Sequence, residues 1–258
     1  MATRSPKKMR LVIPFCVVLI CLLLLLPVAV GAGKVTITSS TLKNPVTLDG
    51  KWTYADEWTD GVSVAEPTHG WFVIKDDSDF LYVLVDHTAD LSSTKGDFAW
   101  VVWDQKNDGG GKPKSDDYDL ILRYTDKTSY ASSVAQGTGT GWGTFKPASS
   151  LGVLSASSTD ATEDPYSKTS HLMFEFQVPR SILDNSTVVT SVGFFAGAQG
   201  ESSWMYLPSA GDYRVPNSWA QLTFSLPVPE FPSVLIMVVV SIAAVGFVSR
   251  RRRQTHVK

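Results

Sequence analysis

The sequence predicts an all-β protein: a single antiparallel β-sandwich of jelly-roll type, flanked by a signal peptide and a C-terminal transmembrane helix. Between residues 34 and 228, short apolar runs are separated by Gly, Asp, Ser, Thr and Pro, which is typical of strands joined by turns. Several runs alternate apolar and polar side chains with the period of two that a half-buried strand requires. No helical period in this region extends beyond two turns. Seven or more strands without disulfides favour a sandwich.

Seven segments of the middle region are predicted strands: 71–74, 80–86, 98–103, 120–124, 172–178, 188–195 and 219–226. Alternation is clearest in 172–178, where Leu172, Phe174 and Phe176 share one side of the strand. A short helix is expected at 179–183. The segment 132–164 is rich in Ser, Thr and Gly, and it is either a long surface excursion or a weak hairpin around Trp142.

Residues 1–33 have the three parts of a secretory signal. A basic start precedes an uncharged stretch from 11 to 30, and small residues around its end suit a signal peptidase, namely Ala29, Gly31, Ala32 and Gly33. Because the uncharged stretch is longer than usual for such signals, an uncleaved membrane anchor is the alternative. In both cases we expect the middle region to be exported.

Residues 229–258 have the composition of a membrane anchor. The motif Pro-Glu-Phe-Pro at 229–232 precedes 17 uncharged residues, 233–249, which as a helix extend about 26 Å and just cross the hydrocarbon core. Four arginines follow at 250–253 and are expected to stay on the cytoplasmic side. This order resembles the PEF-type sorting signals of archaeal surface proteins. The resemblance implies a sortase-like processing protease and attachment at the cell surface.

The predicted domain, residues 34–228, is strongly acidic. It holds 14 basic and 24 acidic side chains, so its formal charge is about −10. Such a surface repels phosphate backbones, which disfavours nucleic acid as a partner and favours cations or neutral polar ligands. Both cysteines, Cys16 and Cys21, lie in the N-terminal segment. Disulfides, thiolate metal sites and a cysteine nucleophile are therefore excluded from the domain.

Several motifs occur in an order found in a known superfamily. The stretch VTLDGKWTYADEWTDG at 46–61 comes first, followed by FLYVLVD, then DFAWVVWDQKNDGG at 97–110 and an acidic run at 116–117. HLMFEFQVPRSIL, VGFFAG and PNSWAQLTF complete the order. Over residues 35–226 the chain resembles family 9 carbohydrate-binding modules and the wider DOMON-like β-sandwiches, which include the haem-binding subunit of ethylbenzene dehydrogenase. The resemblance implies a β-sandwich that binds a ligand, but it does not fix which ligand.

Catalytic motifs are missing from the sequence, so we predict no enzyme activity. The sequence has no Gly-x-Ser-x-Gly, no His-Glu-x-x-His, no phosphate-cradling Gly-rich loop and no Rossmann fingerprint. The four histidines are scattered. Although carboxylate pairs are abundant, a domain with this many acidic residues contains such pairs by chance.

Tryptophans are the first candidates for carbohydrate binding, because sugar rings pack against flat aromatic faces. Trp58 and Trp219 lie in motifs that look structural, and packing is the simplest interpretation of Trp52. Trp142 is flanked by Gly141 and Gly143 in a polar loop, where an exposed indole has few structural reasons to exist. Trp204 and Trp71 are weaker candidates. For all three, packing remains the alternative to ligand binding.

The loop after the predicted strand 98–103 holds the densest group of potential Ca²⁺ ligands. Ca²⁺ prefers six to eight carboxylate and carbonyl oxygens, and the loop region offers Asp104, Asn107, Asp108, Asp116 and Asp117. The spacing does not match an EF-hand, and a solvated acidic loop is the alternative.

Haem binding is the main alternative to carbohydrate binding. In the dehydrogenase subunit that the chain resembles, a methionine and a lysine are the axial ligands. Within the mature domain the sequence offers Met173 and Met205, with Lys75 among the possible partners. Neither methionine lies in a motif that marks it as a ligand. We therefore expect a surface-anchored glycan-binding protein, with a haem or redox module as the alternative and a structural envelope protein as the third interpretation.

Overall fold

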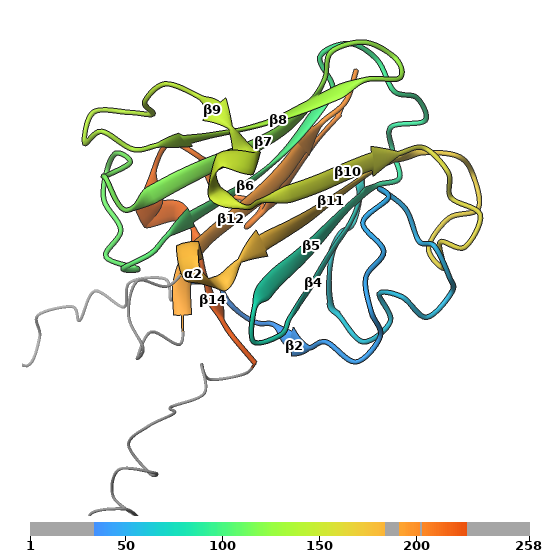
Figure 1. The fold of residues 1–258 in the computed structure, drawn as a ribbon, viewed down its shortest axis with the longest axis horizontal. Helices are drawn as coiled ribbons and strands as arrows, with labels where there is room; N and C mark the ends of the chain where they lie inside the picture. The colour runs from blue at the N-terminus through green and yellow to red at the C-terminus, as the bar shows by residue number, and fades with distance from the viewer. Residues whose placement is uncertain (1–33, 184–190, 202, 226–258) are drawn as a thin grey trace, which may run out of the picture. The chain divides into compact units, whose positions relative to one another are not determined.

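Two β-sheets packed face to face form the domain in the computed structural model, which describes residues 34–183, 191–201 and 203–225 (Figure 1). This confirms the predicted all-β sandwich. Sheet A has eight strands in the order β1-β14-β12-β6-β7-β8-β9, with β13 paired to β12. These strands are β1 (Thr36–Thr38), β6 (Phe98–Asp104), β7 (Asp117–Tyr124), β8 (Tyr130–Gln136), β9 (Lys146–Pro147), β12 (Ser191–Gln199), β13 (Trp204–Leu207) and β14 (Ala220–Thr223).

Sheet B has six strands in the order β10-β11-β5-β4-β2, with β3 paired to β4. They are β2 (Ser40–Thr41), β3 (Val62–Glu66), β4 (Gly70–Asp76), β5 (Phe80–His87), β10 (Leu154–Ser158) and β11 (Leu172–Pro179). The only helices among the described residues are η1 (Ala148–Leu151), α2 (Arg180–Leu183) and η2 (Pro216–Ser218). The helix expected at 179–183 is thus confirmed.

The core between the sheets follows the alternation in the sequence. On β11, Leu172, Phe174 and Phe176 are fully buried in it, as the period of two predicts. From sheet A, Val101 and Trp103 on β6 meet them as part of the same cluster. A core of this kind, built from both inner faces, is what holds a sandwich together.

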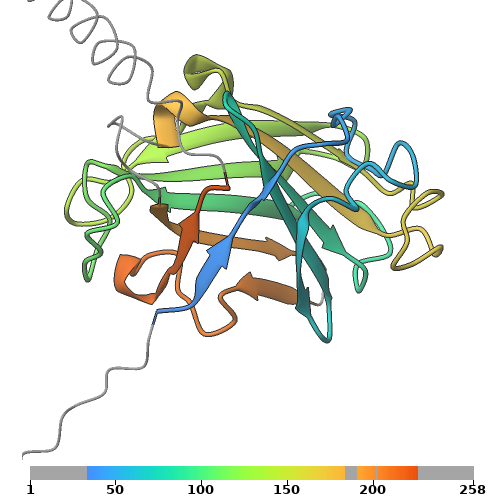
Figure 2. The ribbon, with the colours of Figure 1, turned by 90° about the horizontal axis from the view of Figure 1, so that it is seen from below.

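Both sheets also carry hydrophobic side chains on their outer faces. On sheet B, segments 42–60 and 159–171 cover a second cluster that includes Trp52, Trp58 and Met173. These two segments lie at the same end of the sandwich in Figures 1 and 2. On sheet A, the outer cluster contains Trp100, Val102, Phe195 and Trp219. The strands therefore read as nearly continuous apolar runs, because both of their faces are partly covered.

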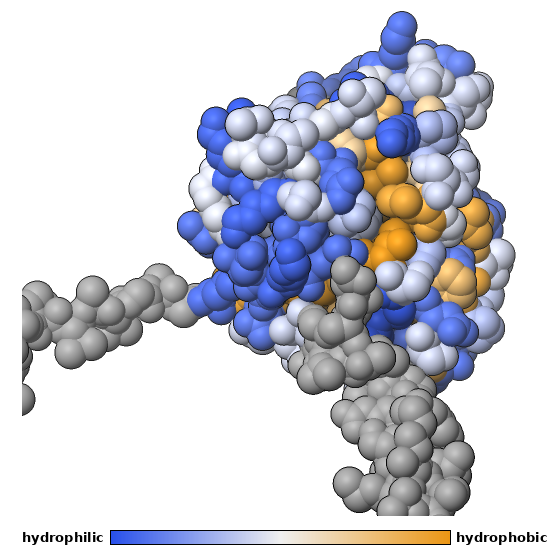
Figure 3. All heavy atoms as spheres, turned by 60° about the vertical axis from the view of Figure 1, so that its left-hand side comes forward, coloured by the Kyte–Doolittle hydropathy of each residue, from blue (hydrophilic) through white to orange (hydrophobic). Residues whose placement is uncertain are grey.

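The two ends of the described domain meet at one edge of sheet A. β1 pairs in parallel with β14, with Ile37 opposite Leu222, and the two strands run side by side in Figure 2. On the face shown in Figure 3, hydrophobic residues gather in a narrow band and hydrophilic residues cover most of the rest.

Four strands of four or more residues were not expected from the sequence: β3, β8, β10 and β13. β8 and β10 are rich in Ser and Ala and include many partly exposed positions, so their alternation is weak. Together with β9 and η1, they account for about half of the segment 132–164. That segment contributes strands to both sheets, and its first part is the expected hairpin around Trp142, because β9 pairs antiparallel with β8.

The predicted signal peptide at 1–33 and the predicted membrane segment at 233–249 lie outside the described residues. None of the helices in the described ranges combines the length and apolar character needed to cross a bilayer.

Candidate functional site

The outer face of sheet A carries a dense group of aromatic rings. On β6, alternation directs Ala99, Val101 and Trp103 into the core, so that Phe98 and Trp100 lie on the opposite face. Rings from β12, β13 and the segment before β14 join them. We call this group the aromatic face, and it consists of Phe98, Trp100, Phe195, Trp204, Tyr206, Tyr213 and Trp219.

A small hollow of about 110 Å³ opens within the aromatic face. It is lined by Phe98, Trp100, Asp119, Ile121, Arg123, Trp204 and Tyr213. Trp204 is 45% exposed, whereas Trp100 beneath it is 2% exposed. The two indoles meet edge to face, with centroids 6.2 Å apart and planes at 78°, and Tyr206 stacks on Trp204 with centroids 6.0 Å apart. The ring of Trp204 is therefore held by its neighbours while it stays accessible to a ligand.

Two polar groups of the hollow lack partners in the described part of the protein. Asp119 is 1% exposed, and its Oδ1 atom is buried without a hydrogen bond. The Nε1 atom of Trp100 is likewise buried and unpaired. Burial raises the pKa of Asp119 to about 7, while the charge of Arg123 lowers it. Unpaired buried polar groups are costly, so these atoms are well suited to bonds with the hydroxyls of a ligand.

Trp142 lies on the same side of the domain but is packed. Its indole stacks on Trp219, with the ring planes at 3° and the centroids 6.2 Å apart, and the residue is only partly exposed. The backbone of its loop is fixed by a bridge between Gly137 and Trp142. The expectation of a freely exposed indole on a polar loop is therefore wrong, because Trp219 offers a flat apolar surface on which it packs.

Trp71 lies on the opposite side of the sandwich. It stacks on Tyr166 with centroids 4.2 Å apart and planes at 11°, over the outer face of sheet B. The three candidate tryptophans thus do not form one site. Sequence reasoning selected Trp204 but missed Phe98, Tyr213 and Asp119. The available signal was the run FAWVVWD, in which both alternating sets are apolar and hence both faces are covered.

The predicted calcium ligands are only partly brought together. Carboxylate oxygens of Asp104, Asp108 and Asp116 lie within 4.8 Å of one another. Asn107 instead accepts a hydrogen bond from Lys34 Nζ at 2.7 Å, and Asp117 accepts one from the Lys114 backbone N–H at 2.6 Å.

The three clustered carboxylates match the oxygen ligands that Ca²⁺ prefers. Asp108 is exposed and is paired with Lys114 Nζ at 2.7 Å, while Lys106 Nζ lies 3.6 Å from Asp116. Burial raises the pKa of Asp117 to about 7, and the neighbouring carboxylates Asp104, Asp116 and Asp108 add to the rise. Mutual repulsion of this kind is what a divalent ion relieves.

The motif at 46–61 is structural. Glu175 on β11 accepts hydrogen bonds from the backbone N–H groups of Asp49 and Gly50 and from Trp58 Nε1. Gly50 has a φ of +83°, and a Cβ there would lie 2.3 Å from the backbone of Ser157, so only glycine fits this close approach. Trp52, Trp58 and Trp219 are all buried, as the structural interpretation of these tryptophans predicted.

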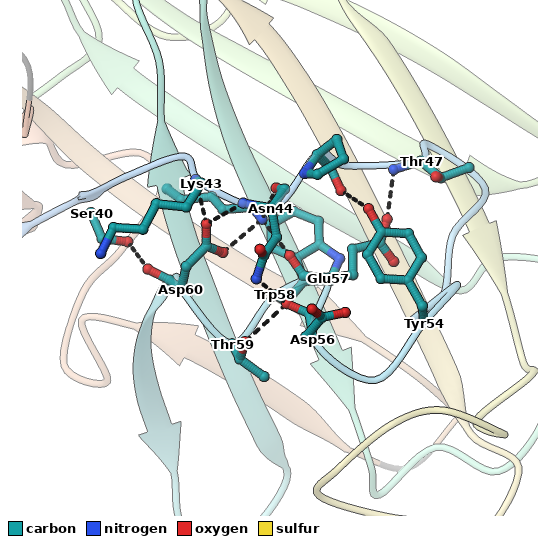
Figure 4. A network of polar contacts seen from close by, with 12 residues as sticks. Ser40, Lys43, Asn44, Thr47, Tyr54, Asp56, Glu57, Trp58, Thr59 and Asp60 are labelled. Carbon is teal, nitrogen blue, oxygen red and sulfur yellow. Dashed lines mark hydrogen bonds and ion pairs between the residues drawn. The ribbon is translucent and has the colours of Figure 1, made fainter.

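A buried lysine completes this network. Lys75 is fully buried, and its Nζ donates to the Asn44 carbonyl at 2.9 Å, to Asp60 Oδ1 at 2.9 Å and to the Glu57 carbonyl. Figure 4 shows how Asp60 in turn accepts from the backbone of Lys43 and Asn44. All three protons of the ammonium group are used, so this side chain holds the segment 43–60 against sheet B.

The residues considered for haem do not fit an axial pair. Lys75 is saturated by the contacts described above. Met205 is buried in the core between the sheets, whereas Met173 is buried on the outer face of sheet B. In the strand register Met173 lies opposite Asp86, and Lys75 lies opposite Tyr82, four positions along β5. These side chains therefore do not converge on one ligand.

Comparison with known proteins gives matches among solved structures alone. No protein-family model matches the chain, and no curated protein matches it. A family 9 carbohydrate-binding module from Caldicellulosiruptor kristjanssonii in complex with cellotriose is similar at a TM-score of 0.49 and 14% identity, over 73% of this chain and 93% of that chain. A structure of such a module from the same organism in complex with glucose gives a TM-score of 0.48 and 15% identity, over 76% and 99%.

Proposed function

We propose that the protein binds carbohydrate, without converting it, in the hollow of the aromatic face. The observation that carries the proposal is an accessible indole, Trp204, in the same hollow as two buried polar atoms that have no hydrogen-bond partner among the described residues, Asp119 Oδ1 and Trp100 Nε1. A sugar ring has an apolar C–H surface, which packs on an indole, and hydroxyls, which bond to a carboxylate and an indole N–H. The hollow offers both kinds of contact within one small volume.

The charge of the hollow narrows the ligand class. Arg123 stands at its rim, with its guanidinium 4.8 Å from the centre of the Phe98 ring, and Asp119 lies at its floor. A carboxyl group and a guanidinium in the same hollow suit a neutral ligand rich in hydroxyls better than a polyanion. The acidic balance of the whole domain disfavours nucleic acid in the same way.

The test is a binding measurement on matched tryptophan variants. A glycan array first identifies a ligand for the full-length protein, and the affinity for it is then measured by titration of tryptophan fluorescence. Trp204→Ala should weaken binding by about 1 to 3 kcal/mol, as the loss of an aromatic contact does. Trp71→Ala is the matched control, since it removes a half-buried stacked indole on the other sheet and should leave the affinity unchanged.

Asp119→Asn distinguishes specific carbohydrate binding in the hollow from nonspecific adsorption to the aromatic face. It keeps the size of the side chain but replaces a carboxylate oxygen with an amide donor, so affinity should fall while the fold is retained. Equal affinity of wild type, Trp204→Ala and Asp119→Asn for every bound glycan would exclude this site. A protein that binds no glycan would point to a structural role in the cell envelope.

We also propose that the domain is displayed at the cell surface on a membrane anchor. This rests on the sequence alone: an N-terminal export signal, the Pro-Glu-Phe-Pro motif, 17 uncharged residues and an arginine tail. In the sequence the proposed anchor follows β14, the strand next to the edge strand β1. A surface glycan receptor requires such display.

A further inference from the structure

A second group of ligand-type side chains is buried at the outer face of sheet B. Asp86 on β5 and both Asp164 and His171 in the covering segment 159–171 are fully buried, and one ligand atom of each lies within 4.8 Å of the other two. They come from positions 78 and 85 residues apart along the chain. The group is separate from the aromatic face, which belongs to the other sheet.

The hydrogen bonds of His171 show which of its nitrogens faces the carboxylates. Nδ1 lies 2.7 Å from the Thr169 carbonyl, and a carbonyl only accepts, so Nδ1 carries a proton. Nε2 then faces Asp86 Oδ1 at 2.6 Å and Asp164 Oδ2 at 3.4 Å. A second proton on Nε2 would make the ring a charged donor to Asp86, whereas an uncharged imidazole would direct its lone pair at these two oxygens, which is unfavourable unless a cation binds all three atoms.

This arrangement has the outer contacts that metal-binding histidines show. A metal-binding imidazole usually donates its other N–H to a carbonyl or carboxylate, which fixes the orientation of the ring. Asp164 is held in the same way, because its oxygens accept the backbone N–H groups of Tyr166 at 2.8 Å and Ser167 at 2.9 Å. Both side chains are therefore oriented in advance.

Asp86 provides an independent sign of a missing partner. The side chain is fully buried, yet its Oδ2 atom accepts no hydrogen bond from the described residues. Two buried carboxylates with a protonated histidine still leave one negative charge. Two carboxylates with an uncharged histidine and a divalent cation are neutral, which removes the cost of a buried net charge.

We propose that Asp86, Asp164 and His171 bind a divalent cation of the zinc type. An imidazole nitrogen with carboxylate oxygens suits Zn²⁺ and related transition metals, whereas Ca²⁺ and Mg²⁺ prefer oxygen alone. Asp86 Oδ2 supplies a further ligand atom. The cation fastens segment 159–171 to β5 and thereby fixes Tyr166, on which Trp71 stacks.

Metal binding to the full-length protein tests the proposal directly. The protein is treated with a chelator and titrated with Zn²⁺, and with Co²⁺ as a spectroscopic probe. One equivalent of Zn²⁺ should bind. The melting temperature should rise by about 5 to 10 °C when Zn²⁺ exceeds its dissociation constant about 100-fold. Co²⁺ should show visible bands shaped by a nitrogen ligand, and Ca²⁺ should not displace it.

Three variants assign the binding to these residues. Because the loss of an outer contact alone weakens metal binding by about 10- to 100-fold, His171→Gln and Asp164→Asn should weaken it by about 100-fold or more. His69→Gln is the matched control, since His69 pairs with Glu66 at 2.7 Å outside the group, and it should bind as the wild type does.

Two results would overturn the proposal. The first is a wild-type protein that takes up neither Zn²⁺ nor Co²⁺. The second is a bound ion that His171→Gln and Asp164→Asn retain but Asp108→Ala loses, which would assign the ion to the acidic cluster of sheet A. If one of the variants does not fold, the other variant and the wild-type titration still decide.

Discussion

Asp119 is buried and also belongs to the proposed binding site, because it lines the hollow with one carboxylate oxygen that has no hydrogen-bond partner among the described residues. Burial raises its pKa to about 7, whereas an aspartate in an unfolded chain titrates near 4. The folded protein therefore holds a proton between these values that the unfolded chain has released. The resulting stability is fully present below about pH 4 and is lost as the pH rises through about 7.

We predict that the wild type loses about 1 kcal/mol through this residue between pH 6.5 and 8.5. Asp119→Asn cannot ionise, so its free energy of unfolding should fall less over that range. Urea unfolding at both pH values measures the difference. Asp79→Asn, at an exposed turn position, is the control and should follow the wild type. An identical pH dependence of Asp119→Asn and wild type would contradict the prediction.

Truncation of Trp58 is predicted to lower the stability of the fold, whereas truncation of Trp204 is predicted to lower mainly the affinity for glycan. Trp58 is fully buried and donates to Glu175 at 3.1 Å, so Trp58→Ala should cost about 3 to 5 kcal/mol of stability. Trp204 is 45% exposed, and Trp204→Ala should cost much less while it reduces glycan affinity. Denaturant unfolding measures both. A large loss of stability in Trp204→Ala would mean that this indole serves packing.

At the scale of elements, the connection between β6 and β7 concentrates negative charge. Asp104 ends β6, Asp116 precedes β7, and Asp108 lies on the loop between them. A bound Ca²⁺ would remove their repulsion and tie the two strand ends together. The loop connects the strands that carry Trp100 and Asp119. A change in how well the loop is ordered would therefore affect the geometry of the hollow.

We predict that millimolar Ca²⁺ raises the melting temperature by several degrees, because a ligand that binds only the folded state stabilises it by mass action. Asp108→Ala should abolish the rise without disturbing the core, since Asp108 is exposed. Thermal unfolding with Ca²⁺, with Mg²⁺ and with matched ionic strength is the measurement. An equal response to all three would indicate general screening of the acidic domain.

At the scale of the whole molecule, the proposed location of the domain rests on the two terminal segments. If residues 233–249 span the membrane, the protein should remain in the membrane fraction after carbonate washing. A chain that ends at Pro227 should be secreted instead, because it retains the export signal and lacks the span. Release of the uncleaved full-length chain by carbonate would contradict this topology.

Much of the sandwich was predictable, because strand burial leaves a local mark. Leu172, Phe174 and Phe176 alternate in the sequence and are buried together in the structure, whereas the strands around 80–86 and 98–103 were found as short apolar runs bounded by polar residues. β8 and β10 were missed, since their small polar residues gain their place from neighbouring strands and not from their own pattern.

The candidate sites were less predictable, because they depend on contacts between distant segments. The sequence by itself determined an acidic, cysteine-free β-domain between two apolar segments, and it singled out Trp204 and the carboxylates Asp104, Asp108 and Asp116. Only the tertiary structure placed Asp119 and Trp204 in the lining of one hollow, packed Trp142 on Trp219 and brought Asp86 to His171. Alternation states which side of a strand a residue faces, whereas strand order and loop packing decide what it meets there.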